Sequence, residues 1–176
     1  NKADHSQLPL TIEEIVSTAN SCWQAGAGGI HVHVRDENNQ HTLDSGLYRE
    51  VINELKIQLP YMFTQITTES VGLYSAIEQR QVVIDVEPSA ASISIAEIFL
   101  NEDRNTVFDF YNGCYDSGVL VQHIIYSEQD IKMLDDLLVN NPHFKNEQLQ
   151  LLFVLGRYSP NLESKPSDLD LYQEWL

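Results

Sequence analysis

Apolar positions along the chain repeat with two periods, one helical and one of strands. Residues 11–14 read Thr-Ile-Glu-Glu, a capping box, and apolar residues at helical spacing continue from there to Gly26. Runs of apolar and β-branched residues that end in polar turns predict strands between such helices. Helices are predicted over 12–25, from a cap at Asp44 to just before Pro60, over 75–83, over 97–116, and from Ser127 and Ser167 onward. Strands are predicted over 29–35, 61–70, 89–97, 118–127 and 149–156.

Strand and helix alternate five times, which indicates an α/β protein with a parallel sheet covered by helices. This pattern alone is equally compatible with an open doubly wound sheet and with part of a barrel. No glycine-rich nucleotide-binding turn follows any of the strands, which disfavours nucleotide-binding folds. Neither a repeat nor a linker divides the chain, so a single domain is expected over 1–176.

Composition restricts the partners. The 176 residues carry a formal net charge of −16, which disfavours nucleic acids and anionic membranes, although an anionic small molecule can still bind beside a local positive charge. No apolar run approaches the ~20 residues that span a bilayer. Cys22 and Cys114 lie in helix-like sequence without a paired-cysteine motif. Free thiols and a cytoplasmic location are therefore expected.

The strand over 29–35 carries the most specific chemistry. His31, His33 and Arg35 alternate with branched aliphatic residues, so all three side chains lie on one face. The histidines are about 7 Å apart at the backbone, a separation from which two imidazoles converge on one metal ion. Arg35 and then Asp36 follow at the carboxyl end of the strand, where parallel α/β folds bind ligands. We expect Asp36 to orient an imidazole or Arg35.

A bare His-x-His in a strand is equally consistent with a polar layer inside a sheet, in which neighbouring side chains satisfy each histidine. A catalytic zinc site has three protein ligands and an open position. This motif supplies two of them, so a third ligand has to come from elsewhere in the chain.

The run "AGAGGIHVHVRDENNQHTLDSGLYREVI" resembles the histidine-strand signature of the β-keto acid cleavage enzymes, the family typified by 3-keto-5-aminohexanoate cleavage enzyme. The likeness extends to "LPLTIEEI" before it and, after it, to "TQITTESVGLYS", "EPSAASISIAEI" and "LFVLGRYSP". Order and spacing are preserved over nearly the whole chain.

The resemblance implies a (β/α)8 TIM barrel of which this chain covers roughly strands two to six, without the first and last strands. It implies a Zn²⁺ cofactor bound by His31 and His33. It also implies a reaction that joins a β-keto acid to acetyl-CoA and splits the adduct by a retro-Claisen step, giving acetoacetyl-CoA or a related CoA ester and a shortened acyl product. The glutamate ligand and the catalytic arginine of the family's last strand have no counterpart here. The 176 residues alone are therefore expected to be an inactive segment. Separately, the whole protein is expected to be a homo-oligomer.

Other candidate residues lie at the strand ends. Arg35, Thr67, Thr68 and Ser70 are candidate catalytic residues. The hydroxyls of the last three can bind the substrate carboxylate, and capping of the next helix is the equal alternative for them. Glu69 stands where the family has glycine, and it either binds a cationic substrate group or points to solvent.

Further along the chain, Ser94 and Glu97 close the next strand, and either can face the substrate pocket. For Glu97 the start of a helix is the favoured alternative, because a carboxylate there suits the helix dipole. Arg157 is a candidate for gripping a CoA phosphate, or a solvated loop residue. His123 is expected in the core, facing the interior if Gln122 and Ile124 face the helices. His41 and His143 are expected to be exposed.

Two other functions remain open. A metal-dependent TIM-barrel hydrolase also uses His-x-His on a strand, but on the first strand and together with later histidines. A non-catalytic metal-binding relative is the other alternative, because the family's glutamate ligand is missing.

Overall fold

A computed structural model describes residues 2–139, 141, 149–157, 159, 161 and 163–175. In this part of the chain five strands form one parallel sheet in sequential order: β1 (Gly29–Val32), β2 (Phe63–Thr67), β3 (Ala90–Ser94), β4 (Leu120–Ile125) and β5 (Gln150–Phe153). The helices are α1 (Ile12–Gln24), α2 (Ser45–Gln58), α3 (Ala76–Val86), α4 (Ile95–Ile98), α5 (Arg104–Asp116), α6 (Glu128–Val139) and the 3₁₀ helix η2 (Pro166–Trp175).

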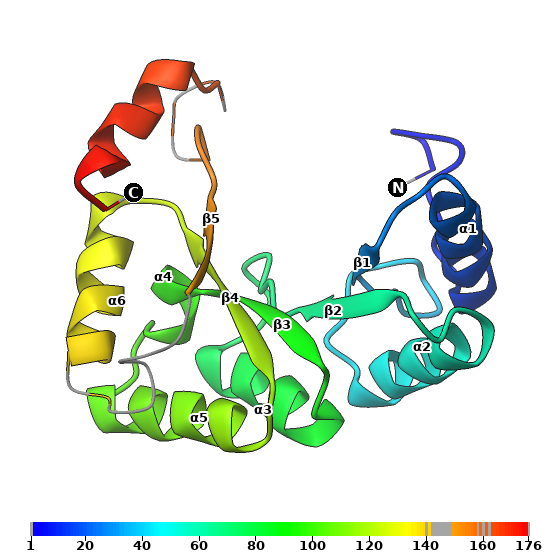
Figure 1. Cartoon of the computed structure of the whole chain (residues 1–176), viewed down its shortest axis with the longest axis horizontal. Coiled ribbons are helices and arrows are strands. Elements are labelled where there is room, and N and C mark those ends of the chain that lie inside the picture. The colour runs from blue at the N-terminus through cyan, green and yellow to red at the C-terminus, as the bar shows by residue number, and fades with distance from the viewer. Residues whose placement is uncertain are drawn as a thin grey trace.

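The sheet is curled into half a barrel, and the helices follow its convex face (Figure 1). β1 and β5 are the two edges of the sheet, so the concave face is open. Sequential parallel order with a helix after each strand is the arrangement that the sequence predicted. The curvature selects the barrel type over the open doubly wound sheet.

Alternate residues of each strand divide between the two faces. The convex face packs into the core beneath the helices through apolar side chains that include Val32, Ile66, Ile93 and Ile125. The other face carries polar side chains in neighbouring strands. They are aligned by the register, which pairs His31 with Gln65 and Ser92 with Gln122. Burial of the convex face therefore leaves a polar row on the concave face.

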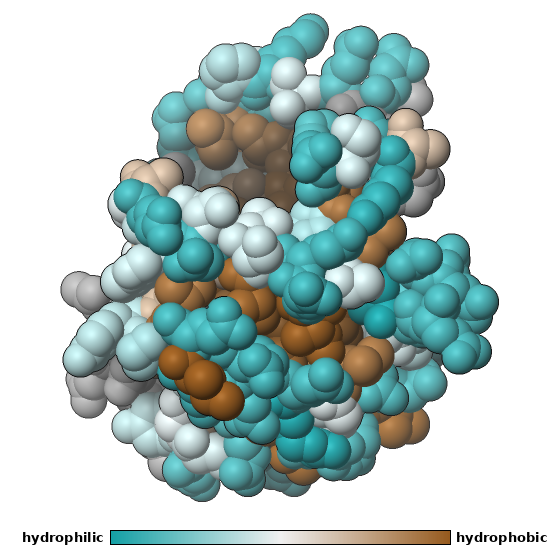
Figure 2. Space-filling view, turned by 90° about the vertical axis from the view of Figure 1, so that its right-hand side faces the viewer, coloured by the Kyte–Doolittle hydropathy of each residue, from teal (hydrophilic) through white to brown (hydrophobic). Residues whose placement is uncertain are grey.

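The concave side also exposes apolar surface. Phe63 in β2, Leu120 in β4 and Leu152 in β5 lie on the same face as the polar row, each two positions from a glutamine of its strand. Their side chains are between 41% and 58% exposed. Figure 2 shows the side of the molecule that carries α1 and α2. Apolar side chains lie between hydrophilic ones on this side, and its upper part is hollowed.

Capping boxes begin the helices where the sequence predicted them. Thr11 and Glu14 form one at α1, where Glu14 also contacts Lys2. At α6, Ser127 accepts from the amide of Asp130, whose carboxylate accepts in turn from the amides of Tyr126 and Ser127. These contacts satisfy amides that a helix start otherwise leaves unpaired.

Three predicted elements differ. The strand over 29–35 pairs only to Val32, because Arg35 turns back into an antiparallel bridge with His41. The amphipathic segment 97–116 is divided into α4 and α5, since Asn101 is left-handed (φ 59°) and Asp103 caps a new helix. The last helix, expected from about Ser167, is the 3₁₀ helix η2. No helix in the described part of the chain has both the length and the apolar character needed to cross a membrane.

Candidate metal and substrate site

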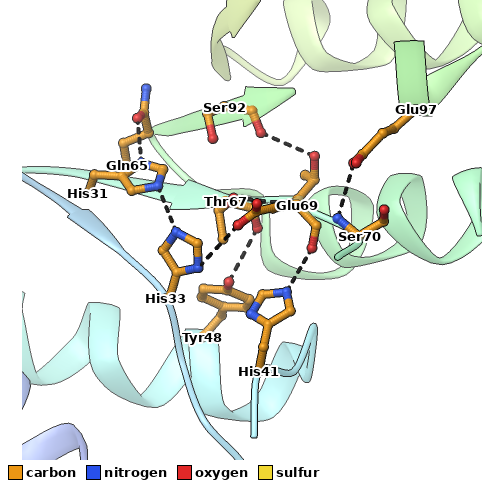
Figure 3. A network of polar contacts seen from close by, with 11 residues as sticks. His31, His33, His41, Tyr48, Gln65, Thr67, Glu69, Ser70, Ser92 and Glu97 are labelled. Atoms are coloured by element: carbon orange, nitrogen blue, oxygen red, sulfur yellow. Dashed lines mark hydrogen bonds and ion pairs between the residues drawn. The ribbon is translucent and has the colours of Figure 1, made fainter. Parts of the chain in front are cut away.

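His31 and His33 converge on the concave face, with their Nε2 atoms 3.1 Å apart (Figure 3). Each imidazole presents its other nitrogen to an oxygen. His31 Nδ1 lies 2.7 Å from Gln65 Oε1, and His33 Nδ1 lies 3.9 Å from Glu69 Oε2. Only the first of these contacts is short enough for a hydrogen bond.

This arrangement fits a metal ion held by the two Nε2 atoms. Two nitrogens bound to one tetrahedral zinc ion lie about 3.3 Å apart, close to the spacing of His31 and His33. If each Nδ1 carries the proton, both Nε2 lone pairs face each other, and a cation between them relieves their repulsion. The described residues contain no group of three histidine, cysteine or carboxylate side chains that could hold a metal ion, so within them the pair supplies at most two ligands.

Burial keeps His33 neutral. Desolvation, together with the charges of His31, His41 and Arg35, lowers the pKa of His33 to about 4. A neutral imidazole is the form that binds metal. His33 is uncharged at pH 7, so metal binding does not first have to deprotonate an imidazolium ring.

The tip of β2 is held from two sides. His41 Nε2 donates to the main-chain oxygen of Glu69 across 2.7 Å, and the amide of Ser70 donates to Glu97 Oε2 across 3.1 Å. His41 is half-buried, although an exposed loop residue was predicted, because its ring lies between His33 and Tyr74. His143, the other histidine predicted to be exposed, lies outside the described residues.

The hydroxyls at this tip are engaged by main-chain groups. Thr68 is fully buried and its Oγ1 donates to Ser92 O, while Thr67 Oγ1 accepts from the amide of Glu69. Ser70 Oγ accepts from the amide of Gly72. These hydrogen bonds shape the tip, and a role in binding the substrate carboxylate stays a prediction for all three residues.

Glu97 lies in the first turn of α4, as the helix-start alternative predicted. Ser94 is buried and caps α4 by accepting from the amide of Glu97. The Glu97 carboxylate reaches the tip of β2 as described, so this residue supports the loop that carries Glu69. Ser94 as a substrate-binding residue stays a prediction.

Arg35 lines a hollow at the edge of β1 together with His31 and His33. Among the described residues its guanidinium forms no ion pair. Asp36 does not orient it, contrary to expectation. The Asp36 carboxylate accepts from the amides of Asn38 and Gln40 and so forms the turn that follows the strand.

Two further residues lie away from the histidine pair. Arg157 is exposed after Gly156, in the loop that follows β5. His123 is 1% exposed and faces the helices, with its ring 5.4 Å from that of Tyr111 in α5. The predicted core position of His123 is confirmed. The condition for an interior-facing His123 is not met, because Gln122 and Ile124 lie on the concave side and not toward the helices.

Sequence reasoning missed Gln65 and Gln122. Gln65 is the register partner of His31, and its Nε2 donates to Gln122 Oε1 across 3.5 Å. Each is signalled in the sequence only by being a polar residue inside a mostly apolar strand. Gln65 also lies two positions before Thr67 and therefore on the same face of its strand. The contact between them spans a third strand, which no local pattern reveals.

Comparisons with known proteins identify the family of the chain. A family model described as beta-keto acid cleavage enzyme matches residues 1–176. The chain is 27% identical to the 3-keto-5-aminohexanoate cleavage enzymes of Fusobacterium nucleatum and Acetoanaerobium sticklandii, covering 88% and 96% of this chain. It is 25% identical over 97 residues to the 3-oxoadipate:acetyl-CoA acetyltransferase of Cupriavidus necator, which covers 55% of this chain and 34% of that protein. The chain spans 58% and 62% of the length of the two cleavage enzymes.

Solved structures show the same fold. A ternary complex of ObcA with a C4-CoA adduct and oxalate aligns with a TM-score of 0.67 at 15% identity, over 85% of this chain and 38% of that one. The apo structure of ObcA aligns with a TM-score of 0.61 at 17% identity, over 85% and 36%. With a family model that covers all 176 residues, the chain belongs to the β-keto acid cleavage enzyme family.

Proposed function

We propose that the protein is a zinc-dependent β-keto acid cleavage enzyme that condenses a β-keto acid with acetyl-CoA and splits the adduct by a retro-Claisen step. The products are acetoacetyl-CoA, or a related CoA ester, and a shortened acyl product. Family membership supports the reaction class. The observation that carries the zinc site is the facing pair of Nε2 atoms of His31 and His33, 3.1 Å apart.

His31 and His33 would hold the metal, and bound Zn²⁺ would supply a Lewis acid that stabilises the enolate-like charge of carbon–carbon bond making and breaking. Arg35, beside both histidines and without an ion pair in the described residues, would bind the substrate carboxylate. Glu69, which is 30% exposed and 3.9 Å from His33, would bind a cationic substrate group. Arg157 would bind a CoA phosphate; the CoA adduct in the ObcA complex supports a CoA ligand for this fold.

The curled five-stranded sheet supports a (β/α)8 barrel in which these strands are the second to the sixth. A third metal ligand would come from outside the described residues. A homo-oligomer without a nucleic-acid or membrane partner stays a prediction, as does a cytoplasmic location. The position of His123 beneath the helices speaks against a hydrolase that uses a later strand histidine as a ligand.

Metal analysis and turnover test this proposal together. The whole protein is expected to contain one zinc ion per chain and to form a CoA ester from acetyl-CoA and at least one member of a panel of β-keto acids. The His31→Ala/His33→Ala double variant is expected to lose both properties, whereas His5→Ala, at an exposed loop histidine, retains them. Undiminished zinc in the double variant contradicts the site. Hydrolysis of a simple ester or amide without any keto-acid turnover favours the hydrolase.

A further inference from the structure

We propose that Gln65 is a positioning residue that fixes the tautomer and the ring orientation of His31, and that Gln122 holds the Gln65 amide in the required orientation. The inference deepens the proposed zinc site and rests on it for the identity of the metal. Neither glutamine touches the metal position, so each acts through His31.

The contact between Gln65 and His31 is built into the sheet. The two residues are direct partners in the ladder between β1 and β2, so their side chains leave the concave face side by side. Gln65 Oε1 lies 2.7 Å from His31 Nδ1. An amide oxygen only accepts hydrogen bonds, so this contact requires the proton on Nδ1 and leaves the Nε2 lone pair directed at the metal position.

The orientation of the Gln65 amide matters, because a flipped amide would present its NH₂ group to Nδ1 and demand the other tautomer. Gln65 Nε2 lies 3.5 Å from Gln122 Oε1. That contact places the amino group of Gln65 toward β4 and its oxygen toward His31 (Figure 3 shows Gln65 beside His31). Gln122, Gln65 and His31 thus form a chain of hydrogen bonds that ends at the metal position.

When no metal is bound, the contacts at the two Nδ1 atoms decide which tautomer each histidine adopts. His31 has a hydrogen bond of 2.7 Å at Nδ1, whereas the carboxylate of Glu69 lies 3.9 Å from His33 Nδ1 and forms none. His31 therefore keeps its proton on Nδ1. His33 then carries its own proton on Nε2 and donates it to His31 Nε2 across 3.1 Å, and this proton is the one that a metal ion replaces.

Outer partners of metal-binding histidines typically change metal affinity by about 10- to 100-fold. Gln65→Leu is expected to weaken zinc binding by about tenfold or more, measured by competition with a chromophoric chelator. Gln122→Leu is expected to produce a smaller loss. Gln65→Glu keeps an acceptor at Nδ1 and is expected to retain affinity. Gln150→Leu is the matched control, because Gln150 is the register partner of Gln122 in β5, one strand farther from His31.

The second readout is the tautomer of His31 in metal-free, ¹⁵N-labelled protein, from long-range nitrogen–proton correlations of the imidazole rings. We expect the Nδ1–H form in the wild type, in Gln65→Glu and in Gln150→Leu, and a shift toward Nε2–H in Gln65→Leu. A wild-type His31 with its proton on Nε2 overturns the proposal, as does a Gln65→Leu variant that binds zinc as tightly as Gln150→Leu. Absence of zinc from the wild-type protein would count against the proposed function only. The role of Gln65 would still be tested by the tautomer of His31 in the metal-free protein.

Discussion

His41 donates a hydrogen bond from Nε2 to the main-chain oxygen of Glu69, 2.7 Å away and 28 residues later in the chain. The contact joins the turn after β1 to the tip of β2. It sets the position of Glu69 beside His33 without using the Glu69 side chain. His41 is also anchored at its own main chain, since its carbonyl accepts from the Tyr74 hydroxyl across 3.4 Å.

Removal of this contact is expected to loosen the tip. His41→Ala leaves the half-buried oxygen of Glu69 without its donor, so the free energy of unfolding should fall by about 1–3 kcal/mol. Urea unfolding measures this change. His5→Ala is the control, because His5 is exposed and its Nδ1 accepts from the nearby amide of Gln7. Equal stability of the two variants would show that the contact contributes nothing.

Glu69 is expected to read the charge of the substrate. Glu69→Gln should lower kcat/KM for β-keto acids with an amine or quaternary ammonium by about thirtyfold, on the order of 2 kcal/mol, because a partly buried ion pair is lost. Matched neutral keto acids, measured with the same variant, should be nearly unaffected. Equal losses on both substrates would instead assign Glu69 to His33, whose Nδ1 is 3.9 Å away.

Acid should destabilise the protein through His123. Burial lowers the pKa of His123 to about 4 from an ordinary value of 6.5. Between these two pH values the unfolded chain binds the proton and the folded protein does not, so the free energy of unfolding falls as the pH falls from 6.5 to 4. The full loss is on the order of 3 kcal/mol.

A variant isolates that contribution. His123→Leu should flatten the dependence of unfolding free energy on pH across this interval, measured by urea unfolding in the presence of a chelator. His5→Leu should leave the slope as it is in the wild type. An unchanged slope in His123→Leu would show that His123 is protonated in the folded protein.

Gly156 precedes Arg157 and should not tolerate a side chain. Its φ is +77°, and a Cβ there would lie 2.7 Å from the main-chain oxygen of Glu163. Gly118 has nearly the same φ, +73°, with nothing within 4 Å of a Cβ. Gly118→Ala should therefore cost about 1 kcal/mol of backbone strain, and Gly156→Ala about 2–4 kcal/mol from strain plus overlap. Thermal unfolding compares the two, and equal costs would mean that the loop at Gly156 moves away freely.

Much of the fold was predictable because its signals are local. The capping boxes at Thr11 and Ser127 depend on residues three positions apart, and the alternation of His31 and His33 with aliphatic residues fixes a shared face. The order of strand and helix then leaves few topologies, since parallel strands need a crossover between them. The division of segment 97–116 was missed because a left-handed Asn101 leaves the apolar spacing almost unchanged.

That two imidazoles share one face of a strand follows from the order of amino acids alone, because strand geometry alternates side chains whatever surrounds them. What those imidazoles contact depends on how the strands pack together. Gln65 is 34 residues from His31, and Gln122 is 57 residues from Gln65. Strand register brings such residues together, and it is set by packing of the whole convex face. The same packing turned His123 toward the helices and left Gln122 on the concave side, which no local pattern around His123 decides.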